Sequence, residues 1–128
     1  MPRLLIADND EPLCDSIRGL LVKEGYEVEW VRDGVAAVEA LKRGDLDLVL
    51  SEVDLPGLDG LELLKLAQEL SPRTLGIVMA ARGSLETAMG AIRQGAQDYF
   101  LKPISASEVA DRVIHLIDLR HQAEEVQF

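Results

Sequence analysis

Residues 47–60 read DLVLSEVDLPGLDG, and this stretch decides the fold. The apolar run Leu48–Leu50 is typical of a parallel strand that is buried on both faces. An acidic residue, Glu52, comes at the end of the strand, and a Pro-Gly turn follows it. This order predicts a strand of a parallel sheet that places one carboxylate at the rim of the sheet. The question of function therefore centres on that carboxylate.

Composition excludes several classes of protein. The chain has 128 residues, of which 48% are hydrophobic, so it fits one globular domain with a sizeable core. A net charge of −10, from 23 acidic and 13 basic residues, disfavours direct nucleic-acid binding. The single cysteine, Cys14, excludes an internal disulfide and a cysteine-cluster metal site. Without a long apolar run or a signal-peptide pattern, we expect a cytoplasmic protein with no membrane contact.

Apolar runs alternate with amphipathic stretches along the whole chain. Strands are predicted at Arg3–Ala7, Glu27–Val31, Asp47–Val53, Leu75–Ala81 and Asp98–Leu101. Helices are predicted at Glu11–Glu24, Gly34–Lys42, Leu61–Glu69, Ser84–Gln94 and from Ser105 onward. Such alternation predicts an α/β fold, a flavodoxin-like doubly wound sheet of five parallel strands in the order 2-1-3-4-5, with five helices.

Three finer expectations come from the same patterns. The spacing of Val35, Val38 and Leu41 predicts that these side chains form the apolar face of the second helix. Ser84 is the predicted cap of the fourth helix, and Ser105 opens a capping box for the fifth. We expect one domain over residues 1–121, with residues 122–128 extending the last helix or beginning a linker.

In this topology a site forms where the carboxyl ends of strands one and three meet. Strand one is followed by Asp8-Asn9-Asp10, and strand three ends at Glu52, so two acidic segments are expected to converge. Asp10 is interpreted as a helix N-cap rather than a ligand. An ion pair between Glu52 and Lys102 is expected whatever the function, because an unpaired buried lysine is costly.

Five segments carry a resemblance to a known family. They are Leu5–Pro12, Gly25–Val28 with Asp33-Gly34, the stretch around Glu52, Gly83–Ala88 and Gly95–Pro103. In this order and spacing the chain resembles response-regulator receiver domains, the CheY-like modules of two-component signalling. The resemblance implies a site at which an aspartate accepts a phosphoryl group from a histidine kinase with the help of Mg²⁺. It covers nearly the whole chain.

The resemblance assigns roles to single residues. Asp8 matches the first acid after strand one, Lys102 matches the lysine of the site, and Tyr99 matches the aromatic residue of the switch. A simpler interpretation also stays open for each of two residues. Asp8 would only accept hydrogen bonds from backbone N–H groups, and Tyr99 would be a surface aromatic residue without a role in the switch.

Three positions depart from the family pattern. Asn9 stands where a second acid usually contacts the metal, and Glu52 replaces the aspartate that accepts the phosphoryl group. Ala80 replaces the threonine or serine whose hydroxyl holds a phosphoryl oxygen. The extra methylene of Glu52 moves its carboxylate out by about 1.5 Å, which disfavours in-line attack. We therefore expect a weak or absent Mg²⁺ site among Asp8, Asn9, Glu52 and Asp54.

These departures favour a signalling module without enzymatic activity that works by protein–protein contact, independently of phosphorylation. The resemblance implies that the fourth helix, the fifth strand and the fifth helix contact a signalling protein or an effector domain. One alternative is a regulator that takes phosphate from a histidine kinase at Glu52 or Asp54. Another is the regulatory part of a transcriptional activator, which Gly83–Ala88 resembles. A homodimer also stays open, whereas few aromatic residues and no phosphate loop disfavour flavin binding.

Overall fold

A computed structural model describes residues 1–81 and 85–125, in which five strands alternate with five helices. The strands are β1 (Arg3–Ala7), β2 (Glu27–Val31), β3 (Leu48–Glu52), β4 (Leu75–Ala80) and β5 (Asp98–Leu101). The helices are α1 (Glu11–Lys23), α2 (Gly34–Arg43), α3 (Gly60–Leu70), α4 (Leu85–Arg93) and α5 (Ala106–Glu125).

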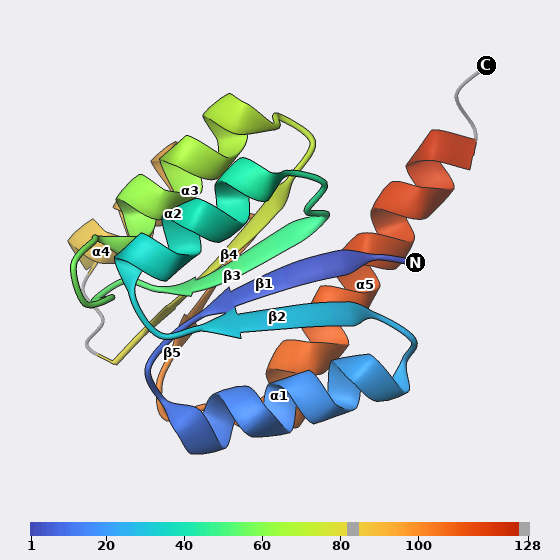
Figure 1. The fold of residues 1–128 in the computed structure, drawn as a ribbon, viewed down its shortest axis with the longest axis horizontal. Helices are drawn as coiled ribbons and strands as arrows, with labels where there is room; N and C mark the ends of the chain where they lie inside the picture. The colour runs from blue at the N-terminus through green and yellow to red at the C-terminus, as the bar shows by residue number, and fades with distance from the viewer. Residues whose placement is uncertain (82–84, 126–128) are drawn as a thin grey trace.

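The strands form one parallel sheet in the order β2-β1-β3-β4-β5, which confirms the predicted fold class. Figure 1 shows α1 and α5 on one face of this sheet and α2, α3 and α4 on the other. Because all strands run the same way, their carboxyl ends lie at one edge. That edge carries the end of β3, which is Glu52, and the residue after β1, which is Asp8.

The core lies on both faces of the sheet because neighbouring strand residues point to opposite sides. In β1, Leu4 and Ile6 pack into the cluster that also holds residues of α1 and α5. Leu5 and Ala7 pack into the cluster formed with α2 and α3. All four are buried. Because both faces of this central strand are buried, its sequence is a continuous apolar run. The packing of the strand in turn fixes the position of the next residue, Asp8.

The prediction for the inner face of α2 was partly wrong. Val35 is 70% exposed, whereas Ala37, Ala40 and Leu41 are buried. The helix approaches its neighbours closely, since a Cβ on Gly34 would lie 2.3 Å from the Cβ of Leu58. Small side chains therefore face inward, and the bulkier valine stays outside.

The bounds of β1, β2 and β5 agree with the predictions, and the described ends of the other elements differ from them by at most one residue. Helix α5 continues without a break to Glu125, so residues 122–125 extend the last helix, and the domain boundary at residue 121 stays a prediction. Ser105 Oγ accepts a hydrogen bond from the Glu108 backbone N–H at 3.1 Å, as half of the predicted capping box. Ser84 and residues 126–128 lie outside the described residues. In the described part of the chain, no helix has the length and apolar character needed to cross a bilayer.

Candidate functional site

Two carboxylates are buried side by side at the carboxyl edge of the sheet. Asp8 is fully buried after β1, and Glu52 is only 4% exposed at the end of β3. The chain beyond β3 turns back closely here: a Cβ on Gly60 would lie 2.1 Å from the carbonyl oxygen of Glu52. The Gly60 backbone N–H also donates to the Val53 carbonyl at 2.8 Å. Only glycine fits at residue 60, so the loop after β3 is pressed against the site.

Lys102 places its ammonium group between these acids. Its Nζ lies 2.9 Å from Asp8 Oδ2, 3.0 Å from Glu52 Oε2 and 3.6 Å from Asp10 Oδ2. The lysine follows β5, and its backbone N–H donates to the Ala80 carbonyl at 2.8 Å. The peptide bond between Lys102 and Pro103 is cis. We call Lys102, Asp8, Asp10 and Glu52 the lysine cluster; its central ion pair is the one predicted.

The charge of the lysine is strongly favoured in this place. Burial by itself lowers the pKa of Lys102, but hydrogen bonds to Asp8 and Glu52 and their negative charges outweigh it and raise the pKa above its ordinary value. The side chain is 14% exposed, so these charges are poorly screened by water. The two buried acids thus stabilise the charged form of the lysine.

The remaining oxygens of the two acids are held by backbone groups. Asp8 Oδ1 accepts from the Asp10 N–H at 2.9 Å, and Glu52 Oε1 accepts from the Ala81 N–H at 3.3 Å. The expected backbone donor for Asp8 is therefore present. Beyond Lys102, Asp8 Oδ2 and Glu52 Oε2 have no hydrogen-bond partner among the described residues. Each acid uses one oxygen for the backbone and one for the lysine.

Asp10 has two contacts. Its Oδ1 accepts from the Leu13 N–H at 3.3 Å, which confirms the predicted N-cap of α1. Its Oδ2 is the third carboxylate oxygen near Lys102. Sequence reasoning missed this second contact, although a cap directly after strand one always lies at the same edge of the sheet.

Two other predicted ligands differ from the buried acids in exposure. Asn9 and Asp54 are both exposed. Within residues 1–81 and 85–125, no group of three or more His, Cys, Asp or Glu side chains is arranged to hold a metal ion. The donor set also has an ammonium group at its centre. Weak Mg²⁺ binding at Asp8, Asn9, Glu52 and Asp54 therefore stays a prediction.

The two residues assigned to the switch are both placed by the structure. Ala80 ends β4 and is fully buried, so a methyl group stands at the position assigned to the hydroxyl. Tyr99 packs on the cluster of Leu64, Val78 and Ala91. Its hydroxyl is buried without a hydrogen-bond partner in the described part of the chain. This inward packing contradicts the interpretation of Tyr99 as a plain surface aromatic.

Trp30 also contacts the site, and sequence reasoning missed it. Its indole N–H donates to the Asp8 carbonyl oxygen at 2.8 Å. The available signal was its place in the second strand, which pairs with β1 so that Trp30 lies opposite Ile6. Cys14 is buried, and its Sγ lies 3.8 Å from the same carbonyl. Burial and the charge of Asp8 raise the pKa of the Cys14 thiol to about 12.

A family model for the response regulator receiver domain matches residues 4–114. The chain belongs to this family. Transcriptional regulatory protein QseB of Escherichia coli O157:H7 is 35% identical over 111 residues, which cover 87% of this chain and 51% of that protein. Response regulator protein FleR of Pseudomonas aeruginosa is also 35% identical over 111 residues, covering 87% of this chain and 24% of that protein.

Solved structures agree with this assignment. The response regulator receiver domain protein (CheY-like) from Methanospirillum hungatei JF-1 superposes with a TM-score of 0.88 at 28% identity. The match covers 96% of this chain and 98% of that one. By contrast, the chain spans about half or less of the length of the two curated relatives. The lysine cluster thus lies at the carboxyl edge of the sheet in a receiver domain, a signalling module of two-component systems.

Proposed function

We propose that this receiver domain signals through protein–protein contact and does not depend on phosphorylation. The observation that carries the proposal is the lysine cluster, in which Glu52 binds Lys102 through one oxygen and a backbone N–H through the other. A carboxylate held in this way is a fixed anion rather than a free nucleophile. Its extra methylene also places the carboxylate about 1.5 Å further out than an aspartate.

Two further features support the proposal. Ala80 has no hydroxyl to bind a phosphoryl oxygen, so a phosphoryl group on Glu52 would lack a partner that the family assigns to this position. Asn9 supplies a neutral amide oxygen in an exposed position, which weakens attraction for a hard divalent cation. Each change affects a different part of phosphoryl transfer. Asn9 affects metal binding, Glu52 affects the attack on the donor, and Ala80 affects the response to a bound phosphoryl group.

The experiment is incubation with acetyl phosphate and Mg²⁺ followed by mass spectrometry of the intact protein. We expect no phosphoryl adduct. The triple variant Asn9→Asp/Glu52→Asp/Ala80→Thr restores the family's residue types and serves as the positive control, which we expect to be labelled. A stable phosphoryl group on the unaltered chain would overturn the proposal.

A second candidate function is that of a receiver that is still phosphorylated by a histidine kinase. Asp54 favours it, because this carboxylate is exposed two residues beyond β3 and is free of the crowding around Glu52. If the unaltered chain is labelled, Asp54→Asn and Glu52→Gln identify the acceptor by loss of the label. Persistence of the label in the double variant Glu52→Gln/Asp54→Asn would exclude both positions.

For the partner surface we propose α4, β5 and α5. Met89 and Ile92 on α4 and Leu101 on β5 are exposed apolar side chains, and the two elements are in contact. Such a patch fits an effector domain of a longer protein, a separate signalling protein or a second copy. Sedimentation equilibrium of the chain and of Ile92→Asp tests the second copy: a dimer that the substitution dissociates supports it, and a monomer in both excludes it.

A further inference from the structure

Trp30 holds the main chain of Asp8 from the β2 side of the site. The indole N–H donates to the Asp8 carbonyl oxygen at 2.8 Å, and the Asp8 N–H donates to the Val31 carbonyl at 3.1 Å. Strand β1 ends at Ala7, so regular strand pairing does not fix the Asp8 carbonyl. A side-chain donor from the neighbouring strand takes that role.

A face of the same indole ring is covered by an arginine that belongs to a surface ion pair. The guanidinium carbon of Arg32 lies 4.4 Å from the centroid of the Trp30 ring, within the range of a cation–π contact. Arg32 also pairs with Glu11 at 3.4 Å, and both side chains are more than half exposed. Glu11 is the first residue of α1 and follows Asp10, the N-cap. A continuous series of contacts therefore runs from the surface through Trp30 to Asp8.

The orientation of the Asp8 peptide matters because it directs the Asp8 carboxylate. One carboxylate oxygen must reach Lys102 at 2.9 Å while the other accepts from the Asp10 N–H at 2.9 Å. Both contacts depend on the direction of the Cα–Cβ bond, which the flanking peptide planes set. Without the indole donor the Asp8 carbonyl would keep the weak Cys14 Sγ donor at 3.8 Å, so the peptide could rotate more freely and the contact with Lys102 would lengthen.

We propose that Trp30 is a positioning residue for Asp8, and that it links the lysine cluster to the Arg32–Glu11 pair at the surface. A change of charge in the site then alters the surroundings of the indole ring. A change at Arg32 alters the site in turn, because coupling between two places is reciprocal. This link does not depend on whether Glu52 accepts phosphate, so the labelling experiment and the experiments below succeed or fail separately.

The first experiment uses the fluorescence of Trp30, the only tryptophan of the chain. Glu52→Gln removes a charge that Lys102 contacts but leaves Trp30 itself unchanged. We expect a shift in the emission of Trp30 relative to the unaltered chain. Arg112→Gln is the matched control, because it removes one charge from the Asp98–Arg112 pair on another part of the sheet. Equal emission from both variants and the unaltered chain would overturn the proposal.

The second experiment reads the site from the opposite direction. Trp30→Phe keeps an aromatic ring beneath Arg32 but removes the donor to Asp8. We expect the ammonium protons of Lys102, observed by NMR, to exchange with water about fivefold faster, as the loss of one hydrogen bond near 1 kcal/mol implies. Arg32→Gln should give a smaller acceleration. Unchanged exchange in both variants would overturn the proposal, and Arg32→Gln keeps this test available if Trp30→Phe does not fold.

Discussion

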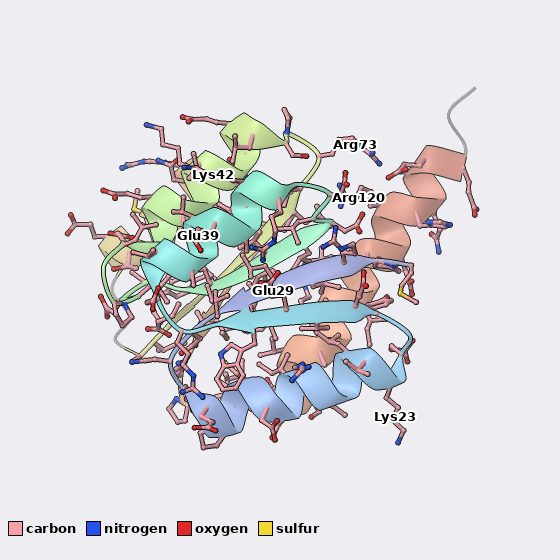
Figure 2. The ribbon with its side chains drawn as sticks, viewed as in Figure 1. Lys23, Glu29, Glu39, Lys42, Arg73 and Arg120 are labelled. Atoms are coloured by element: carbon pink, nitrogen blue, oxygen red, sulfur yellow. The ribbon has the colours of Figure 1, made fainter. Side chains whose placement is uncertain are left out.

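Two ionic clusters lie at opposite edges of the same sheet and differ in burial. The lysine cluster is at the carboxyl edge, where Lys102 meets the buried Asp8 and Glu52. At the amino edge, Arg73, Arg120, Glu124 and Asp47 form a second group, which we call the arginine cluster. Figure 2 shows Arg73 and Arg120 near each other beside the end of α5. In the lysine cluster three acids surround a single cation. In the arginine cluster two cations lie near the same acid, Glu124.

The arginine cluster connects helix α5 with the loops that precede β3 and β4. Arg120 donates to the Asp47 carbonyl at 2.6 Å, and Arg73 pairs with Glu124 at 2.6 Å. A cavity of about 230 Å³ lies among these side chains. Arg120 is 18% exposed but Arg73 is 72% exposed, so even this cluster has an inner and an outer half. From this comparison we expect the contribution of an ion pair to the free energy of unfolding to depend on its burial rather than on the distance between its charged atoms.

The largest expected effect is that of breaking the lysine cluster. Lys102→Met leaves Asp8 and Glu52 buried without a counter-charge, so we expect the free energy of unfolding at neutral pH to fall by about 3 kcal/mol. Urea denaturation measures it. Adding Glu52→Gln should recover part of the loss, because one uncompensated charge is then removed. A loss below about 1 kcal/mol for Lys102→Met would contradict the importance given to burial.

Alkaline pH tests the same buried region without a substitution at the cluster. The folded chain raises the pKa of Cys14 from 9.0 to about 12 and also raises that of Lys102 above 10.5. The native state therefore keeps these protons more tightly than the unfolded state. Stability is complete below pH 9 and is lost as the pH rises toward 12, at roughly 1 kcal/mol per pH unit for each group that titrates. Denaturation curves across this range measure the loss.

Cys14→Ala is the control for the alkaline experiment. It removes the thiol contribution, so the stability of this variant should begin to fall only above pH 10. There the unfolded chain loses first the proton of Tyr26, whose pKa burial raises in the folded state, and then that of Lys102. The same early decline in both proteins would assign the effect to another group.

Breaking the inner half of the arginine cluster should have an intermediate effect. Arg120→Met removes a charge-assisted hydrogen bond to the Asp47 carbonyl, and we expect a loss of about 1–2 kcal/mol in unfolding free energy. Arg120→Lys retains the charge but lacks the planar donor group, so its unfolding free energy should lie between those of Arg120→Met and the unaltered chain. Lys102 and Arg120 are similarly buried, but their partner acids are not. If Arg120→Met costs as much as Lys102→Met, the burial of the acids does not rank the two clusters.

The smallest effect is expected at the outer half. Glu124→Gln weakens the pair with the exposed Arg73, so the unfolding free energy should fall by less than about 1 kcal/mol. In about 1 M salt the difference should vanish, because exposed charges are screened within about 3 Å. Glu125→Gln, which affects the exposed pair with His121, is the matched control. A larger, salt-insensitive loss for Glu124→Gln would show that this pair is effectively buried.

Patterns that repeat along the chain were enough to predict the fold. Apolar strands such as Leu48–Glu52 alternate with helices, and parallel pairing then leaves few topologies. The inner face of α2 was harder to predict, because hydropathy favours Val35 while close packing selects Ala37 and Ala40. That choice depends on the distance between helix and sheet, which no single segment contains.

The site was predictable to the extent that strand ends define it. Asp8, Glu52 and Lys102 were expected together and are in contact. The contact of Trp30 with Asp8 was not predicted, since it depends on the register between β1 and β2. Asn9 and Asp54 have ligand-type side chains at the right positions along the sequence, yet both are exposed. Side-chain direction in a loop is not fixed by a strand period.

Helix α5 joins the two clusters mechanically. It begins at Ala106, shortly after Lys102, and its last turns extend past the sheet beside the N terminus (Figure 1). Its 20 residues make a rod about 30 Å long, attached near its far end through Arg120 to Asp47. A displacement of the Lys102 segment would therefore reach this rod at its first turn, where it would be resisted by the buried face of α5 around Val113 and by the far attachment at Arg120.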